Sequence, residues 1–249
     1  MEMKNVKSIT IPEGSVKQIT DSNGKIIWGS QAAFPYRRLD SITLGAGSYL
    51  VDTTRTFNGS YGGRLTCEVT NAVSQMGIIG TQTGGSTNNM VVYNSGSNTL
   101  GLRFAGLSTV YTTNTILNYP VVVCYFNWTK KCRVRLYNTL GGSTAEVKDT
   151  GTATYTVNNS FPNIILKGYG YSGGNIQNIG EMKIYEYTTW TSTSEEQGTN
   201  AAYYFVPVQR RSDNAIGLFD IKHKIFIAAT NQQYCTAGNL ITEYWDQTT

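Results

Sequence analysis

The sequence predicts an all-β protein built as a many-stranded sandwich or jelly roll. Short runs rich in β-branched and aromatic residues recur along most of the 249 residues, and Gly, Asn or Ser turns separate them roughly every 8–15 residues. No stretch of ten or more residues keeps a 3.6-residue period without β-branched residues. The 17 tyrosines, the 26 glycines and a charged fraction of only 14% favour sheets with exposed faces over a disordered chain.

The first 30 residues predict a separate β-meander. Alternating apolar and polar residues mark strands at 6–11, 16–20 and 25–28, and Asp21-Ser22-Asn23-Gly24 is a strong hairpin signal. A unit this small buries little apolar area on its own, so we expect its apolar side chains to dock on a partner or to support oligomerisation. These residues are Val6, Ile9, Ile11, Val16, Ile19, Ile27 and Trp28. Small residues and a proline then predict a linker over 31–35.

The remaining strand-like runs predict one main domain over 36–241, followed by a C-terminal tail over 242–249. The net charge of +4 is scattered, and its densest cluster is Lys130, Lys131, Arg133 and Arg135. Strand alternation places Arg133 and Arg135 on one face, which we interpret as a solvated sheet face rather than a nucleic-acid surface. No apolar run is long enough to span a membrane, and the first residues lack the apolar core of a secretion signal. We therefore expect synthesis in a cytoplasm, without nucleic-acid or membrane partners.

The four cysteines are Cys67, Cys124, Cys132 and Cys235. Their spacing contains no C-x-x-C, and the chain has a single histidine, so the pattern fits no zinc site. Cys124 and Cys132 each fall in a strand-like run that a hairpin could bring together. Free, mostly buried thiols are favoured over disulfides.

Two ends of the main domain resemble a known family. The opening reads Y-R-R-L-D-S-I at 36–42 and G-S-Y-L-V-D-T at 47–53, K-I-Y follows at 183–185, and the closing motif reads Y-F-V-P-V-Q-R-R-S-D-N-A-I-G-L-F-D at 204–220. These segments resemble the concanavalin-A-like (laminin-G-like) jelly-roll domains of gut phage and gut bacterial proteins. The resemblance is specific over 36–53 and 180–228, whereas 54–179 matches in strand rhythm. The sequence departs from the family at 43–46 and in a long insertion over 188–201.

The N-terminal segment is similar to short leaders that precede such domains on virion proteins. This resemblance implies a non-enzymatic surface protein of a phage particle, most similar to a head fibre or capsid decoration protein of a tailed phage of gut Bacteroides. The leader would dock on capsid or other virion proteins, and a homotrimer would let three leaders form one stem. The jelly roll would be purely structural or would bind cell-surface or mucin glycans. Alternatives are a tail-fibre or baseplate receptor-binding protein, a bacterial surface adhesin module, and a glycoside hydrolase.

Aromatic residues close to Gly, Thr or Asn are the candidates for glycan binding, because rings stack on sugar faces and hydroxyl groups bond to sugar hydroxyls. Ordinary packing in a sheet or at a subunit interface is the alternative role for each. The ligand-binding candidates are Tyr61, Tyr111, Trp128, Tyr169, Tyr171 and Trp190.

The acids do not form the pattern of a glycosidase, which needs two facing carboxylates. Glu181 and Glu186 have odd spacing, which predicts opposite faces of a strand, and Asp213 and Asp220 are separated by a turn and a strand. His223, the lone histidine, reads as an exposed turn residue. We therefore expect no catalytic residues, no metal ligands and no cofactor. Laminin-G-like domains often bind calcium, but this sequence has no D-x-D-x-D cluster that would indicate a calcium site.

The closing motif also has a physical interpretation without the family. Asp213-Asn214 predicts a turn that bonds its own backbone, and Asp220 is expected to end the next strand. Ile216, Leu218 and Phe219 are expected in a core. Arg210 or Arg211 could pair with Asp213 or Asp220.

Overall fold

Strands make up nearly all of the regular structure in the computed structural model, which describes residues 18–20, 26–29, 34–54, 62–81, 90–128, 130–153, 163–170, 176–191 and 200–242. The chain divides into two units, Met1–Pro35 and Tyr36–Thr249. No helix in the described part is long and apolar enough to cross a membrane.

In the first unit, β1 (Gln18–Thr20) and β2 (Ile26–Gly29) pair antiparallel, and the Asp21-Ser22-Asn23-Gly24 turn expected between them lies outside the described residues. The expected strand over 6–11 lies outside the described residues. The same holds for Val6, Ile9, Ile11 and Val16 and for the side chains of Ile19, Ile27 and Trp28. The docking role of these residues therefore stays a prediction.

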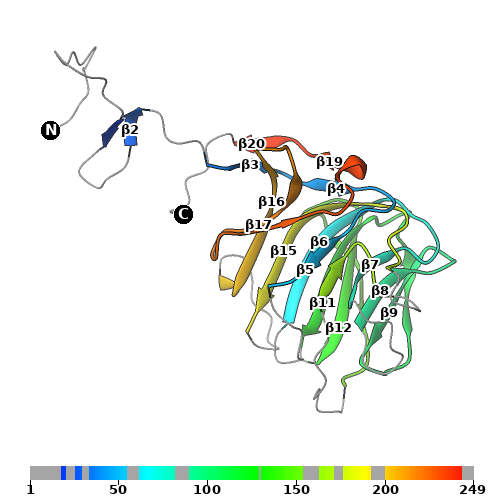
Figure 1. Ribbon diagram of the computed structural model, residues 1–249. Coiled ribbons are helices and arrows are strands. Elements are labelled where there is room, and N and C mark those ends of the chain that lie inside the picture. Colours follow the sequence, from blue (N-terminus) through cyan, green and yellow to red (C-terminus); the bar gives the residue numbers. More distant parts are fainter. Residues whose placement is uncertain are drawn as a thin grey trace, which may run out of the picture. The chain divides into compact units, whose positions relative to one another are not determined.

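The second unit is built from two antiparallel sheets (Figure 1). The small sheet has six strands in the order β10-β9-β8-β7-β14-β5. Its strands are β5 (Leu50–Asp52), β7 (Gly77–Thr81), β8 (Met90–Asn94), β9 (Thr99–Phe104), β10 (Val110–Thr115) and β14 (Ile164–Leu166).

The large sheet has twelve strands, eight of which follow the order β13-β12-β11-β6-β15-β16-β17-β18. These eight are β6 (Gly62–Asn71), β11 (Val121–Trp128), β12 (Lys131–Tyr137), β13 (Thr144–Asp149), β15 (Glu181–Trp190), β16 (Tyr203–Arg210), β17 (Ile216–Asp220) and β18 (Ile225–Ala228). The other four are β3 (Tyr36–Leu39), β4 (Ile42–Leu44), β19 (Cys235–Ala237) and β20 (Leu240–Thr242). β3 pairs with β16 and β20, and β4 pairs with β15 and β19, so the start and the end of the domain lie side by side.

Alternation along each strand separates a buried face from an outer face. In β12, Cys132, Val134 and Leu136 are buried, whereas Arg133 and Arg135 are only partly buried on the other face. The prediction that the two arginines share one outer face is therefore confirmed. The same alternation in facing strands brings two apolar surfaces together, which is the condition for a sandwich.

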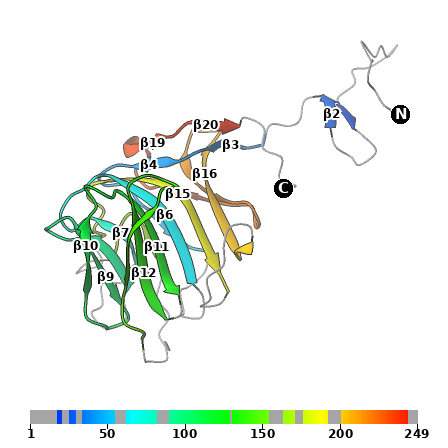
Figure 2. The ribbon, with the colours of Figure 1, turned by 180° about the vertical axis from the view of Figure 1, so that it is seen from behind.

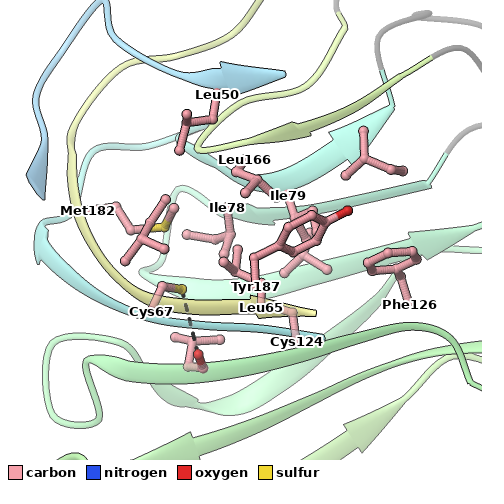
Figure 3. Close-up of a cluster of buried hydrophobic side chains, with 14 of the residues drawn as sticks. Leu50, Leu65, Cys67, Ile78, Ile79, Cys124, Phe126, Leu166, Met182 and Tyr187 are labelled. Atoms are coloured by element: carbon pink, nitrogen blue, oxygen red, sulfur yellow. Dashed lines mark hydrogen bonds between the residues drawn. The ribbon is translucent and has the colours of Figure 1, made fainter. Parts of the chain in front are cut away.

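The core lies between the two sheets (Figure 3). Leu50, Ile78, Ile79 and Leu166 come from the small sheet or its flanks, and Leu65, Cys67, Cys124, Phe126, Met182 and Tyr187 come from the large sheet. Full burial of each large aliphatic or aromatic side chain contributes about 1.5–3 kcal/mol. One polar contact joins the sheets through this layer, because the Tyr187 hydroxyl donates to Asp52 Oδ2 at 2.8 Å.

Three of the cysteines are buried free thiols, as the sequence predicts, and Cys235 is a half-buried free thiol. The Cys67 thiol donates to the Val122 carbonyl at 3.6 Å. Burial raises the pKa of Cys67 and Cys124 well above the usual range and raises the pKa of Cys132 to about 12. The thiolate form of these groups is therefore scarce at neutral pH.

The two sheets are joined at both sides of the sandwich. On one side, Glu146 of β13 accepts hydrogen bonds from the backbone N–H groups of Thr113 and Asn114 at 2.8 and 2.7 Å. These bonds tie the large sheet to β10, the edge strand of the small sheet that is labelled in Figure 2. On the other side, the Thr230 N–H donates to the Tyr49 carbonyl at 2.9 Å, and the Ser48 hydroxyl donates to the Thr230 carbonyl at 2.8 Å. These contacts satisfy backbone groups that would otherwise form open strand edges.

The closing hairpin follows the sequence prediction with one difference. Asp213 accepts the Ala215 N–H at 3.1 Å and pairs with Arg210 at 2.6 Å, and Ile216 and Leu218 enter the core. Phe219 is buried on the opposite face of β17, where its ring lies 4.7 Å from that of Tyr36. Alternation explains the difference, since Phe219 is adjacent to Leu218 and must point the other way.

Asp220 is the polar centre of the next turn. It is completely buried, and its two oxygens accept backbone N–H groups from Tyr204 at 2.8 Å, Lys222 at 3.3 Å and His223 at 2.9 Å. The exposed His223 ring, expected in a turn, also bonds to Asp220 through Nδ1 at 2.6 Å and stacks on Tyr203. The carboxylate thus fixes the β17–β18 turn against β16.

A buried lysine ties three loop carbonyls together. The Lys167 side chain is fully buried, and its Nζ donates to the carbonyls of Gly45, Ser48 and Asn178 at 2.5, 3.1 and 2.6 Å. Burial lowers the pKa of this amine to about 8. The β4–β5 connection and the segment before β15 therefore share one cationic centre.

Replacing Asp220 by Ala leaves three backbone N–H groups without their acceptor, so we expect a loss of about 3 kcal/mol in the free energy of unfolding. Chemical denaturation followed by tryptophan fluorescence measures this loss. The control His223→Gln removes only the exposed ring and is expected to cost less than about 1 kcal/mol. Equal effects of the two changes would contradict the proposed role of the buried carboxylate.

Lys167→Met is expected to become more damaging as pH rises from 8 to 10. The folded pKa of about 8 lies below the ordinary 10.5, so between these values the unfolded chain binds more protons and Lys167 stabilises the fold increasingly. The stability difference between wild type and Lys167→Met should grow in favour of wild type by roughly 2 kcal/mol over this range. Denaturation curves at several pH values measure it, with Lys148→Met on the edge strand β13 as the control. A difference that stays constant with pH would contradict the assignment.

Candidate functional site

A row of alternating glycines and tyrosines crosses the outer face of the small sheet. In the strand register, Gly77 of β7 faces Tyr93 of β8, Tyr93 faces Gly101 of β9, and Gly101 faces Tyr111 of β10. Residues that face one another across neighbouring strands point to the same side of a sheet. The row lies opposite the core, because Leu100 and Leu102, the neighbours of Gly101, are fully buried in it.

The glycines form a floor on which the rings lie. A Cβ atom at Gly101 would be 2.7 Å from Cε1 and Cζ of Tyr93, and one at Gly77 would be 2.7 Å from Cδ1 of Tyr169. Gly80 lies under Tyr169 in the same way, in contact with its Cβ. Any larger residue at these positions would push a ring off the sheet, so glycine is required here for close approach.

The rings of Tyr93 and Tyr169 lie on this floor and Tyr111 is bonded to Tyr93 beside it, and we call Tyr93, Tyr111 and Tyr169 the tyrosine platform. The ring centroids of Tyr93 and Tyr169 are 6.2 Å apart, with 47° between the planes. The hydroxyl oxygens of Tyr93 and Tyr111 are 3.3 Å apart and share a hydrogen bond. The Tyr111 side chain is 48% exposed, whereas Tyr93 and Tyr169 are partly buried. The platform thus offers ring surface and hydroxyl groups together.

The Tyr93 hydroxyl at the centre of the platform is neutral at physiological pH. Burial, the hydrogen bond to Tyr111 and the neighbouring ring of Tyr169 raise the pKa of Tyr93 to about 12, while the positive charge of Arg103 acts in the opposite direction. Arg103 follows Gly101 by two residues on β9 and faces Val91 of β8, so it lies on the same outer face. Arg103 therefore adds a positive charge to the face that carries the platform.

The predicted ligand-binding residues have different outcomes. Tyr111 and Tyr169, which come from distant parts of the sequence, are brought to one site. Trp190 is fully buried at the end of β15, over Gly62, so its expected place on a binding surface is wrong. Gly62 leaves the room that the indole fills, and a run of four buried residues ends the strand there. Tyr61 and Tyr171 lie outside the described residues, as does the side chain of Trp128 in β11.

Sequence reasoning missed Tyr93, Arg103 and the glycine floor. The sequence around Tyr93 is that of an ordinary strand, because the exposure of this ring depends on the register of β8 with β7 and β9. The available signal was glycine inside strand-like runs, at 77, 80 and 101, which marks close approach of another group to the backbone. That signal shows a close contact without showing which residue makes it.

The outer face of the large sheet carries paired charges. Arg64 and Arg133 form ion pairs with Glu186 and Asp149, and the Tyr204 hydroxyl donates to Glu186 at 3.0 Å. Arg135 lies over the ring of Tyr125 at 5.0 Å. These contacts couple neighbouring strands, as cross-strand pairs do in other sheets.

The expectation that Glu181 and Glu186 point to opposite faces is wrong. A bulge lies between Ile184 and Glu186, so Tyr185 and Glu186 are both on the outer side, as Glu181 is. A bulge adds one residue to a strand and reverses the alternation beyond it. Glu181 contacts the Thr70 hydroxyl at 2.7 Å, and both oxygens of Glu186 are engaged by Arg64 and Tyr204.

The described residues contain no group of three or more His, Cys, Asp or Glu side chains that could hold a metal ion. Asp213, in the turn before the closing hairpin strand β17, and Asp220, at the end of that strand, do not face one another. Asp213 is exposed and paired with Arg210, and Asp220 is buried among backbone N–H groups.

Comparison with known proteins identifies the fold and no closer relationship. No family model matches the sequence, and no curated protein matches it. Among solved structures, a candidate carbohydrate binding protein from Bacteroides ovatus matches with a TM-score of 0.52 and 14% identity over 82% of this chain and 61% of that one. The chain therefore spans about three fifths of that protein.

Two other solved structures resemble the chain more distantly. A SAP-like pentraxin from Limulus polyphemus is 12% identical over 82% of this chain and 96% of that one, with a TM-score of 0.48. The CBM40 domain of the Ruminococcus gnavus IT-sialidase is 9% identical over 69% of this chain and 96% of that one, with a TM-score of 0.40. Together with the two packed antiparallel sheets, the likeness to the Bacteroides ovatus protein shows that the main domain is a jelly-roll β-sandwich of the concanavalin-A-like type.

Proposed function

We propose that the jelly-roll domain binds glycans without enzymatic activity, and that the tyrosine platform is its binding site. The observation that carries this proposal is the Tyr93 ring over Gly101, with the Tyr111 hydroxyl bonded to that of Tyr93 and the Tyr169 ring beside it. Sugar rings present C–H faces that stack on aromatic rings, and their hydroxyl groups bond to tyrosine hydroxyls. The Bacteroides ovatus protein of similar fold is a candidate carbohydrate binding protein, which agrees with this choice.

The platform is small and open, so a single domain is expected to bind weakly. Tyr111 is the most exposed ring of the three and lies at the edge strand β10 of the small sheet. Several copies on one particle would raise the effective affinity, because later contacts form at high local concentration.

We further propose that the protein is a phage virion surface component, either a head fibre or a capsid decoration protein, made in the host bacterial cytoplasm. Its N-terminal unit would dock on capsid or other virion proteins as a homotrimer. The resemblance of the leader over 1–28 and of the closing motif over 204–220 to such proteins supports this role. The division of the chain at Pro35 agrees with a docking unit followed by a displayed domain. A receptor-binding role on a tail fibre or baseplate uses the same two parts.

Tyr111→Ala is expected to weaken glycan binding about tenfold and to leave the unfolding midpoint unchanged, since it removes a stacking ring from an exposed position. A glycan array identifies the best ligand, and calorimetry measures the affinity of both proteins for it. Tyr234→Ala is the control, because this ring is 52% exposed on the turn before β19. Unchanged binding by Tyr111→Ala, or equal losses in the two variants, would rule out the platform.

The proposed role of the N-terminal unit predicts a trimer for the full chain and a monomer for a chain that begins at Tyr36. Light scattering coupled to size-exclusion chromatography measures both masses. A full-length monomer would argue against the fibre role and in favour of a free-standing adhesin. If the chain without residues 1–35 is still a trimer, the contacts between subunits are made by the jelly roll and not by the N-terminal unit.

A further inference from the structure

The small sheet is almost free of negative charge. The sequence has no Asp or Glu between Glu68 and Glu146 or between Asp149 and Glu181, and these stretches contain five of its six strands with their connecting loops. The sixth strand, β5, holds Asp52, which is buried and bonded to Tyr187 in the core. The described strands of this sheet therefore place no carboxylate of their own on its outer face.

A carboxylate of the large sheet, that of Glu146, is bonded to the small sheet. Glu146 on β13 lies against β10, and its two oxygens accept the N–H groups of Thr113 and Asn114. It contributes to joining the sheets, and both of its oxygens are in use.

Arg103 places a positive charge on this face. Its alternation with Leu102 and Phe104, both fully buried, directs it outward beside Val91. Arg103 lies two residues along β9 from Gly101, on which the Tyr93 ring rests, and its positive charge acts against the raised pKa of Tyr93. A guanidinium presents a planar set of donors that matches the two oxygens of a carboxylate or a sulfate.

From this charge distribution we propose that the platform selects glycans that carry a carboxylate or sulfate group. This inference rests on the proposed glycan-binding function. The sugar ring stacks on Tyr111 and its neighbours, and the anionic substituent binds Arg103. A nucleic acid fits this face less well, because duplex recognition needs many cationic contacts and this face offers Arg103 alone among the described residues.

Matched pairs of ligands test the inference on the full-length chain. Oligogalacturonate and its methyl ester differ in the carboxylate, and sulfated and unsulfated dextran oligosaccharides differ in the sulfate. Calorimetry at low salt is expected to show about tenfold tighter binding of the anionic member of at least one pair, and the preference should shrink as salt rises. The pair that shows the preference identifies which anionic group is recognised.

Arg103→Gln is expected to abolish this preference, and Arg103→Lys to retain part of it, since an ammonium keeps the charge without the planar donors. Arg135→Gln removes the same charge from the outer face of the large sheet and should retain the full preference. A preference that survives in Arg103→Gln, or that falls equally in Arg135→Gln, would overturn the inference.

The outcome also separates this inference from the glycan-binding function. Equal binding of charged and neutral members, with loss of both in Tyr111→Ala, would overturn the anionic selectivity and retain the platform. Binding of all four ligands that does not depend on Tyr111, or no binding of any, would overturn both. Circular dichroism of every variant confirms that each is folded.

Discussion

The alternation of side chains along the strands is the constraint on which both the core and the candidate site depend. In β9, Leu100, Leu102 and Phe104 fill the space between the sheets, and Gly101 and Arg103 must then face outward. The platform is therefore the reverse side of the core, and the burial that stabilises one fixes the other. A shift of one residue in the pairing of β8 with β9 would turn the outward side chains of one of these strands, Tyr93 or Arg103, toward the core, at a large cost in buried polar groups.

The fold class could be predicted from local patterns in the sequence, because period-two alternation and turn residues each involve only a few neighbouring positions. The turn at Asp213 and the inward side chains of Ile216 and Leu218 could be predicted in this way. The site could be predicted only in part, since Tyr111 and Tyr169 each reach Tyr93 through the pairing of β14, β7, β8, β9 and β10 in one sheet. No local pattern determines this strand order.

Two failures have definite physical causes. Trp190 is buried because Gly62, on a neighbouring strand, leaves room for its indole, and such a pairing is invisible in the residues around Trp190. The face of Glu186 was mispredicted because one bulge reverses the alternation of β15.

The buried charge of Lys167 also depends on contacts between distant segments. Its ammonium group bonds to three carbonyls from two other segments, and no pattern near residue 167 predicts them. Buried polar groups of this kind hold loops in place only when every partner is present.

The buried thiols have a consequence for where the domain can persist. Cys67, Cys124 and Cys132 lie in the core as thiols with raised pKa values, and oxidation proceeds through an accessible thiolate. The core therefore forms without an oxidant and is shielded from one afterwards. A domain held together in this way can pass from reducing to oxidising surroundings with no change in the covalent structure of its interior.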